Sequence, residues 1–192
     1  MNLTVSELAR VVHGHVEGGA DVRVIGAEVD SRRLREGDLF VALRGARCDG
    51  HAFVDSALQT AAAALVRSDA ELDPPPADRA LVRTADPLAA YHELAAHERQ
   101  QRGWTTAAVT GSVGKTTTKD MLAAFAASQR RTGASTGNRN STLGLPAELL
   151  SQSGEIEVFV AETGMSQPGE LSLLGGILRP QVVLYTRIAH AH

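Results

Sequence analysis

The apolar positions near the start of the chain recur at helical spacing. They stand at Val5, Leu8, Val11 and Val12. Thr4 and Glu7 lie three residues apart, which is the spacing of a capping box, in which each side chain bonds the other residue's backbone N–H. The pattern therefore predicts a helix that begins after Thr4 and ends near Gly14.

Short apolar runs after this helix predict strands. We expect strands over residues 22–25, 38–43, 64–66 and 80–83, and a helix over residues 51–63. Three consecutive prolines at 74–76 exclude both helix and central strand there. Asp86 and Pro87 are residue types preferred at the cap and the first position of a helix, so a helix should start there and run toward Arg102.

From Trp104 onward, strand-like and helix-like segments alternate. The expected strands cover residues 105–110, 156–162 and 181–186, the expected helices cover 116–128, 146–151 and 168–178, and a Gly/Asn-rich loop covers 133–144. Strands separated by helices pair in parallel, and their ligands bind at the carboxyl ends of the strands. We place the domain boundary near residue 84, which gives an N-terminal domain over 1–84, a connecting helix over 85–103 and a second domain over 104–192.

The segment that follows strand 105–110 carries the clearest chemistry. Its sequence, Thr-Gly-Ser-Val-Gly-Lys-Thr-Thr-Thr over 110–118, places two glycines before a lysine and three hydroxyls. Backbone N–H groups of such a loop, with the positive end of the next helix, hold phosphate oxygens. Lys115 would reach the β- and γ-phosphates, and the Thr116 hydroxyl would hold Mg²⁺. The expected ATP site consists of Gly111, Ser112, Val113, Gly114, Lys115, Thr116 and Thr117.

The spacing of this loop is irregular. The standard phosphate loop has a further glycine six residues before the lysine, and Val109 occupies that position. An ordinary glycine-rich turn between strand and helix is the alternative. The predicted fold class is α/β, with a small N-terminal α/β domain followed by the start of a P-loop ATPase-type parallel sheet flanked by helices, which the chain leaves incomplete.

Acidic and histidine side chains follow two later strands of the expected sheet. Glu162 ends an apolar run at the edge where the glycine loop also opens, and a carboxylate there suits Mg²⁺. His190 and His192 follow strand 181–186. A metal site and an ordinary surface position both remain open for these three side chains.

Two polar loops are further candidates for ligand contacts. One covers residues 137–146 and carries Asn138 and Asn140. The other covers 45–51 and would, with Ser31 and Arg32, hold an anionic nucleotide through arginine forks and hydroxyls. For both segments the alternative is an ordinary polar loop.

Composition narrows the class of protein. The 192 residues are 43% hydrophobic and 21% charged, which is typical of a soluble globular chain. A net charge of −3 gives no basic footprint for nucleic acid, and no apolar run is long enough for membrane insertion. Cys48 is the single cysteine, so it cannot form an internal disulfide. Because the N-terminus also lacks a signal-peptide pattern, we expect a cytoplasmic protein.

Together these motifs resemble the Mur ligases, which add amino acids to the UDP-linked muramoyl precursor of peptidoglycan. The resemblance rests on Asp30-Ser31-Arg32, on residues 37–42 and 49–54, on the short loop 110–117, on Gly137-Asn138-x-Asn140 with Gly144-Leu-Pro146, and on Glu162-Thr-Gly-Met165 with Gly169-Glu170. The short loop is the family's own form, which accounts for Val109. The last two groups point to the member that adds D-alanyl-D-alanine to the tripeptide precursor.

The resemblance implies an ATP-dependent amide ligase with ATP and Mg²⁺ as cofactors. Its substrates would be UDP-N-acetylmuramoyl-tripeptide and D-alanyl-D-alanine, joined through an acyl phosphate. It also implies residue roles: catalysis by Lys115, Asn138 and Glu162, metal binding by Thr116, Glu162 and His192, and binding of the UDP end by Ser31, Arg32, Arg47, Asp49 and His51.

The chain departs from the family's pattern at several positions. Val113 stands where Ser or Asn is common, and Ser141 and Thr142 replace an Asn-Asn or Asn-Asp pair. Arg187 stands where Asn is usual. A cation beside a metal site would repel Mg²⁺ or bind phosphate instead.

Members of the family are more than twice as long as this chain. We therefore expect the front part of a ligase, which is inactive alone because closure of a further domain is missing. The alternatives are the diaminopimelate- or lysine-adding Mur ligase, a folylpolyglutamate synthetase-like enzyme, a non-catalytic module that binds UDP-sugar or ATP, and an unrelated P-loop NTPase or kinase. The N-terminal motifs argue against the last of these. The oligomeric state is left open.

Overall fold

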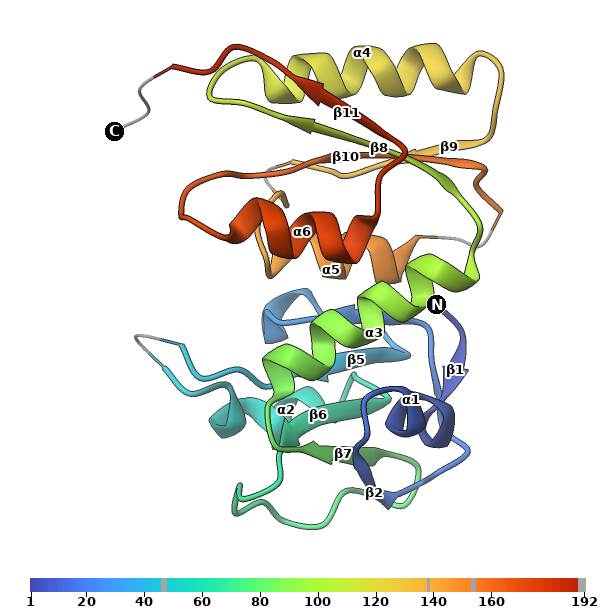
Figure 1. The fold of residues 1–192 in the computed structure, drawn as a ribbon. Coiled ribbons are helices and arrows are strands. Elements are labelled where there is room, and N and C mark those ends of the chain that lie inside the picture. Colours follow the sequence, from blue (N-terminus) through green and yellow to red (C-terminus); the bar gives the residue numbers. More distant parts are fainter. Residues whose placement is uncertain (46–47, 138, 153–154, 190–192) are drawn as a thin grey trace. The chain divides into compact units, whose positions relative to one another are not determined.

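A computed structural model describes residues 1–45, 48–137, 139–152 and 155–189. The chain forms two compact units, Met1–His97 and Glu98–His192 (Figure 1). The division falls inside helix α3 (Pro87–Gln101), whose first turn is capped by Asp86 through the backbone N–H groups of Leu88 and Ala89. The predicted start of this helix is therefore confirmed.

The first unit is built on a five-stranded sheet. Its order is β2 (His15–Gly18), β7 (Ala80–Thr84), β6 (Ala63–Arg67), β5 (Asp38–Val41) and β4 (Gly26–Glu28). The last four strands are parallel, and β2 runs antiparallel to β7. The central strands are mostly apolar, as is usual for parallel strands that are covered on both faces. Leu39, Phe40 and Val41 of β5 are at most 1% exposed.

The remaining elements of this unit are short. Strands β1 (Leu3–Thr4) and β3 (Arg23–Val24) form an antiparallel pair, and α1 (Val5–Val11) has the predicted capping box. Two 3₁₀ helices, η1 (Ser31–Arg33) and η2 (Gly50–Phe53), follow β4 and β5, and α2 (Val54–Ala57) follows η2.

The predicted helix over residues 51–63 is wrong in extent, since helix ends with α2 and strand β6 begins at Ala63. The four alanines at 61–64 favour helix by propensity, but each is at most 6% exposed. Burial in and beside the sheet therefore overrides local preference.

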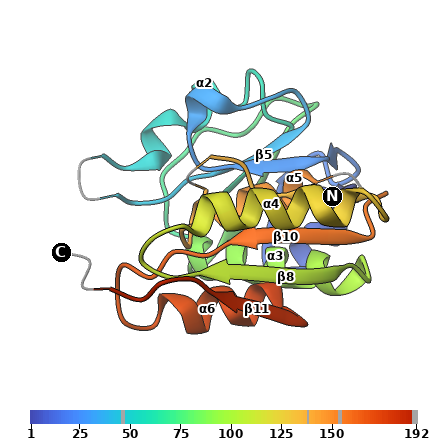
Figure 2. The ribbon, with the colours of Figure 1, turned by 90° about the horizontal axis from the view of Figure 1, so that it is seen from above.

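The second unit is a parallel sheet flanked by helices, as the sequence predicts. Its order is β11 (Val182–Tyr185), β8 (Thr105–Thr110), β10 (Val158–Glu162) and β9 (Thr132–Ala134), all parallel. Helix α4 (Lys115–Ala127) covers one face, and α5 (Gly144–Ser151) and α6 (Glu170–Leu178) cover the other (Figure 1). Seen from above, β8 and β11 lie to one side of α4 rather than beneath it (Figure 2). The predicted α/β fold class is confirmed.

All described helices are short. The longest, α3, has 15 residues and mixes charged with apolar positions along its length. Within the part of the chain that the structure describes, no helix combines the length and the apolar character that crossing a membrane requires.

Candidate functional site

The glycine loop joins the carboxyl end of β8 to the first turn of α4. Gly111 and Gly114 have φ values of 136° and 86°, which L side chains rarely adopt. A Cβ atom on Gly111 would also lie 2.1 Å from the hydroxyl of Thr186. Gly114 is the N-cap of α4 and supplies no side-chain cap, so the helix begins with backbone N–H groups that an anion can occupy.

Lys115 lies folded over this loop. Its Nζ donates to the carbonyl oxygen of Gly111 at 2.7 Å and to that of Ser112 at 3.4 Å. These neutral acceptors hold the ammonium beside the loop, where a phosphate oxygen is a stronger partner. A bound phosphate would therefore draw Nζ away from the Gly111 carbonyl.

The segment after β11 fixes the shape of the loop. The backbone N–H groups of Ser112 and Val113 donate to the carbonyl of Arg187, at 2.9 and 3.4 Å. The Ser112 hydroxyl donates to the Ala189 carbonyl at 2.8 Å and accepts from the Ala189 N–H at 3.1 Å. Ser112 therefore uses its side chain within the protein. Val113 contacts this segment through its backbone N–H, and the residue is 62% exposed.

Thr116 and Glu162 meet at the carboxyl edge of the sheet. The Thr116 hydroxyl donates to Glu162 Oε2 at 2.7 Å, and the Asn140 amide donates to Oε1 at 2.8 Å. The Glu162 N–H donates to Ser135 Oγ at 2.9 Å. Glu162 is only 3% exposed, so the Thr116 hydroxyl and the Asn140 amide replace the water that its carboxylate loses on burial.

The donor set suits a hard cation. Mg²⁺ is held by one or two protein oxygens together with phosphate and water oxygens, and Thr116 with Glu162 supplies such a pair. Among the described residues, no cluster of three His, Cys, Asp or Glu side chains could hold a metal without such help. His192, predicted as a metal ligand, and Asn138, predicted as a catalytic residue, lie outside the described residues.

In the first unit, Asp30 and Arg32 bind each other. Asp30 Oδ1 accepts from the backbone N–H of Arg32 at 3.1 Å and from its Nε at 2.8 Å, while Oδ2 accepts from Nη2 at 2.8 Å. The Arg32 side-chain hydrogen bonds lower the pKa of Asp30 to about 2. Ser31 begins the 3₁₀ helix that Asp30 caps. The predicted role of Ser31 and Arg32 in binding UDP stays a prediction.

His51 is anchored at both ring nitrogens. The Arg67 backbone N–H donates to Nε2 at 3.0 Å, so Nε2 carries no proton. Nδ1 is therefore the protonated nitrogen and donates to Asp49 Oδ1 at 2.6 Å. Asp49 also caps η2, and the backbone hydrogen bond from His51 lowers its pKa. These contacts tie the loop to β6; Arg47 lies outside the described residues, and a UDP contact by this loop stays a prediction.

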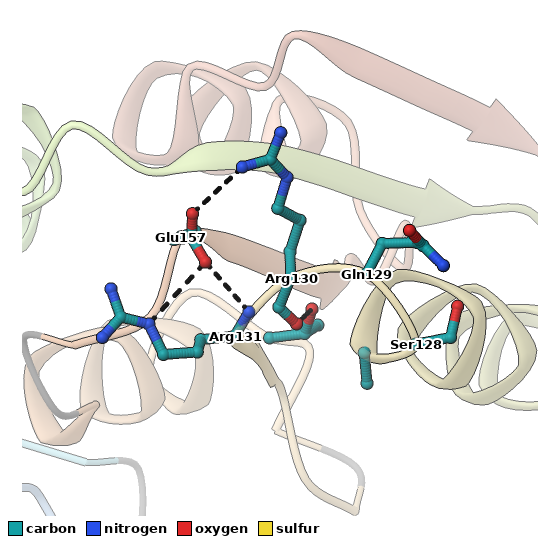
Figure 3. A pocket seen from close by; sticks show the side chains of 7 residues that line it. Ser128, Gln129, Arg130, Arg131 and Glu157 are labelled. Carbon is teal, nitrogen blue, oxygen red and sulfur yellow. Dashed lines mark hydrogen bonds and ion pairs between the residues drawn. The ribbon is translucent and has the colours of Figure 1, made fainter.

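A surface hollow lies at the opposite end of α4 from the glycine loop. It has a volume of about 600 Å³ and is lined by residues 127–132 and Glu157 (Figure 3). Arg130 and Arg131 both point to Glu157, which accepts from Arg130 Nη1 at 3.2 Å. The carbonyl end of a helix disfavours anions, and both cations are already paired. The hollow therefore lacks the features of a phosphate site.

Sequence reasoning missed part of the site in the second unit. Asn140 belongs to the Gly137-Asn138-x-Asn140 motif, but the family resemblance implies a role only for Asn138, two residues before it. Ser135 and the buried Lys119 carried no recognisable signal. Both depend on β9, a three-residue strand that begins one residue before the predicted Gly/Asn-rich loop and extends into it.

The fold and the site together define a class of protein. A parallel sheet, a glycine loop at its carboxyl edge and an acidic side chain on the neighbouring strand are the parts of a phosphate-loop α/β protein. Residues 109–192 match the Mur ligase middle domain, and residues 23–99 match the description "Mur ligase family, catalytic domain". The chain belongs to the Mur ligase family.

Several relatives match over most of the chain. The UDP-N-acetylmuramoyl-tripeptide–D-alanyl-D-alanine ligase of Bacillus subtilis is 36% identical over 98% of this chain. A crystal structure of MurF from Acinetobacter baumannii superposes with a TM-score of 0.88, at 32% identity over 100% of this chain and 42% of that one. A MurF ligase from Thermotoga maritima, solved with ADP, gives a TM-score of 0.74 at 32% identity over 87% of this chain and 38% of that one. The chain spans 42% of the length of the Bacillus subtilis relative.

Proposed function

We propose that this chain supplies the ATP-binding and precursor-binding parts of a ligase that adds D-alanyl-D-alanine to UDP-N-acetylmuramoyl-tripeptide. The observation that carries the proposal is the Thr116–Glu162 contact beside a glycine loop whose helix begins without a side-chain cap. The names of the relatives favour this reaction over addition of diaminopimelate or lysine. We also propose a cytoplasmic location, since the proposed reaction consumes ATP.

The proposed reaction begins with two anions. The terminal carboxylate of the precursor attacks the γ-phosphorus of ATP, ADP leaves, and the amine of D-alanyl-D-alanine then displaces phosphate from the acyl phosphate. The barrier to the first step is mainly electrostatic. Lys115 and the uncapped N–H groups at the start of α4 would hold the phosphates and offset their charge.

Thr116 and Glu162 would hold Mg²⁺ with the nucleotide. When bound, the ion neutralises phosphate charge and polarises the phosphorus–oxygen bonds. Asn140 donates to the Glu162 carboxylate, and Ser135 accepts from the Glu162 backbone N–H. Together the two contacts hold this residue in place. Asn138 near the γ-phosphate and His192 at a second metal remain parts of the proposal.

In the first unit, the loops after β4 and β5 would hold the UDP end of the precursor through Ser31, Arg32, Arg47, Asp49 and His51. The Arg32 side chain is 86% exposed, and it would have to share its guanidinium between Asp30 and a phosphate of the precursor. The chain alone is not expected to ligate, because it spans 42% of its relative's length.

Titration calorimetry of the chain with ATP and Mg²⁺, and separately with the UDP-tripeptide, tests the proposal. We expect both to bind, and we expect no pentapeptide product when ATP, Mg²⁺, the UDP-tripeptide and D-alanyl-D-alanine are combined with the chain. Lys115→Ala should lower ATP affinity about 10- to 100-fold, the size of a lost hydrogen bond to a charged group, and leave UDP-tripeptide affinity unchanged. Equal ATP affinity in the variant would contradict the proposal.

A further inference from the structure

Helix α4 buries a charge where an apolar residue is the usual choice. Lys119 is its one buried residue, at 5% exposure, and every residue of this helix is described. Its Nζ donates to the Ser135 carbonyl oxygen at 2.8 Å and lies 2.7 Å from a carboxylate oxygen of Asp120, which is itself largely exposed. Burial of an ammonium is costly, and here it is offset by one carbonyl and one solvated carboxylate. Cohesion of the core alone does not require a lysine at this position.

The acceptor of Lys119 leads directly to the candidate metal site. Ser135 is 2% exposed and follows the last residue of β9. Its carbonyl oxygen accepts from Lys119, and its hydroxyl oxygen accepts from the backbone N–H of Glu162 at 2.9 Å. Ser135 therefore links the ammonium on α4 to the residue whose carboxylate meets Thr116.

Lys119 and Thr116 lie three positions apart on α4, so they share one face of the helix. That face reaches Glu162 by two routes: Thr116 donates to its carboxylate, and Lys119 donates to Ser135, whose hydroxyl accepts from the Glu162 backbone N–H. A shift of the Ser135 carbonyl would thus move Glu162 relative to the Thr116 hydroxyl.

A second buried charge holds the loop that continues from Ser135. Glu148 of α5 is 7% exposed and accepts from the Thr136 hydroxyl at 2.8 Å and from the Thr136 N–H at 3.3 Å. It also lies 3.4 Å from Arg139 Nε. Helices α4 and α5 lie on opposite faces of the sheet (Figure 1), so the loop is held from both sides. Asn140, which follows Arg139 in this loop, donates to the Glu162 carboxylate.

We propose that Lys119 and Ser135 are positioning residues, which set the Glu162 carboxylate for the Mg²⁺ that binds with ATP. This inference rests on the proposed function, because it needs a nucleotide-linked cation at Glu162. It predicts a specific defect when either residue is replaced. Mg²⁺ should raise the ATP affinity of the variant less than that of the unaltered chain, while the contacts of the glycine loop with phosphate change little. Outer-shell partners of metal ligands typically account for 10- to 100-fold in metal affinity.

The experiment measures ATP affinity of the chain by calorimetry in Mg²⁺ and in EDTA. For Lys119→Met and for Ser135→Ala, we expect the gain in affinity from Mg²⁺ to fall about tenfold, and the affinity in EDTA to stay within about twofold. Lys119→Arg keeps a charged donor and should restore part of the gain. Asp120→Asn is the matched control, since it removes the exposed partner of Lys119 without changing the Ser135 contact, and it should behave as the unaltered chain.

Retention of the full Mg²⁺ gain in Lys119→Met, or an equal loss of affinity in Mg²⁺ and EDTA, would overturn the inference and leave the proposed function standing. If Lys119→Met does not fold, Ser135→Ala decides by the same two criteria. An unaltered chain that binds ATP equally with and without Mg²⁺ would overturn the proposed metal site, and with it this inference.

Discussion

The two units of this chain hold their candidate sites together in different ways. In Met1–His97, the side chains of the candidate loops bond partners two residues away, Arg32 with Asp30 and His51 with Asp49, and His51 also accepts from the Arg67 N–H, 16 positions on. In Glu98–His192, the Thr116–Glu162 contact joins residues 46 positions apart. The first kind of contact shapes a loop locally. The second forms only when a helix and a strand have already packed, so its presence points more directly to a selected site.

The difference gives each unit its own expected response to mutation. Changes to the local contacts of the first unit should alter the stability of that unit and leave ATP binding unchanged. Changes to the long-range contacts of the second unit should alter ATP or Mg²⁺ binding more than stability.

Gly111→Ala should abolish measurable ATP binding. The new Cβ would lie 2.1 Å from the Thr186 hydroxyl, at a φ of +136°. Such strain costs of order 1–3 kcal/mol and would displace the loop from the segment that follows β11. Gly176→Ala is the control, because a Cβ there meets nothing within 4 Å and an alanine favours the helix. Calorimetric ATP binding that survives in Gly111→Ala would show that this loop is not the phosphate site.

Glu162→Gln should change ATP affinity in opposite directions with and without Mg²⁺. With the ion present, loss of the carboxylate should weaken binding about tenfold or more, since Mg²⁺ prefers anionic oxygen. In EDTA the variant should bind ATP slightly more tightly, because a buried negative charge no longer repels the phosphates. Paired titrations check this, and equal weakening in both buffers would contradict the metal role.

His51→Ala should destabilise the first unit by about 1–3 kcal/mol, because the Arg67 N–H loses its acceptor. ATP affinity should not change. His15→Ala, at an exposed strand position, should stay within about 0.5 kcal/mol of the unaltered chain. Urea denaturation measures both. If His51→Ala instead keeps its stability and loses UDP-tripeptide affinity, then His51 is a ligand contact rather than a loop anchor.

Asp30→Ala should cost about 1 kcal/mol at neutral pH, the usual size of a lost N-cap. The folded state lowers the pKa of Asp30 from its ordinary value of 3.8 to about 2, so the carboxylate stabilises the fold fully above pH 4. That contribution is lost as the pH falls from 4 toward 2. The stability difference between chain and variant should therefore shrink over this range in denaturation experiments, and a difference that widens would refute the Asp30–Arg32 account.

Much of the fold follows from local sequence signals. The capping box at Thr4, the Asp86 cap and strand β8 were all predictable, because each depends on residues adjacent in the chain. Strand β9 was not, since three residues with a central glycine carry almost no periodic signal. It forms because β10 offers it a parallel edge.

The same limit applies to the candidate site. The glycine loop and Glu162 can be predicted from residue type and order. Ser135 and Lys119 cannot, because their contacts form only when β9 pairs with β10. Asn140 was visible within its motif, yet only the fold shows that its amide meets the Glu162 carboxylate. Residues that act through another residue leave a weaker trace in the sequence than those that contact a ligand.

We expect this chain to hold ATP and Mg²⁺ at the carboxyl edge of its second sheet. A crystal structure of the chain with Mg²⁺ and a non-hydrolysable ATP analogue tests it most directly. We predict phosphates in the glycine loop, Lys115 Nζ moved from the Gly111 carbonyl to a phosphate oxygen, and Mg²⁺ between Thr116 and Glu162. Phosphates bound elsewhere, with Lys115 still on Gly111 and the Thr116–Glu162 hydrogen bond intact, would contradict the account.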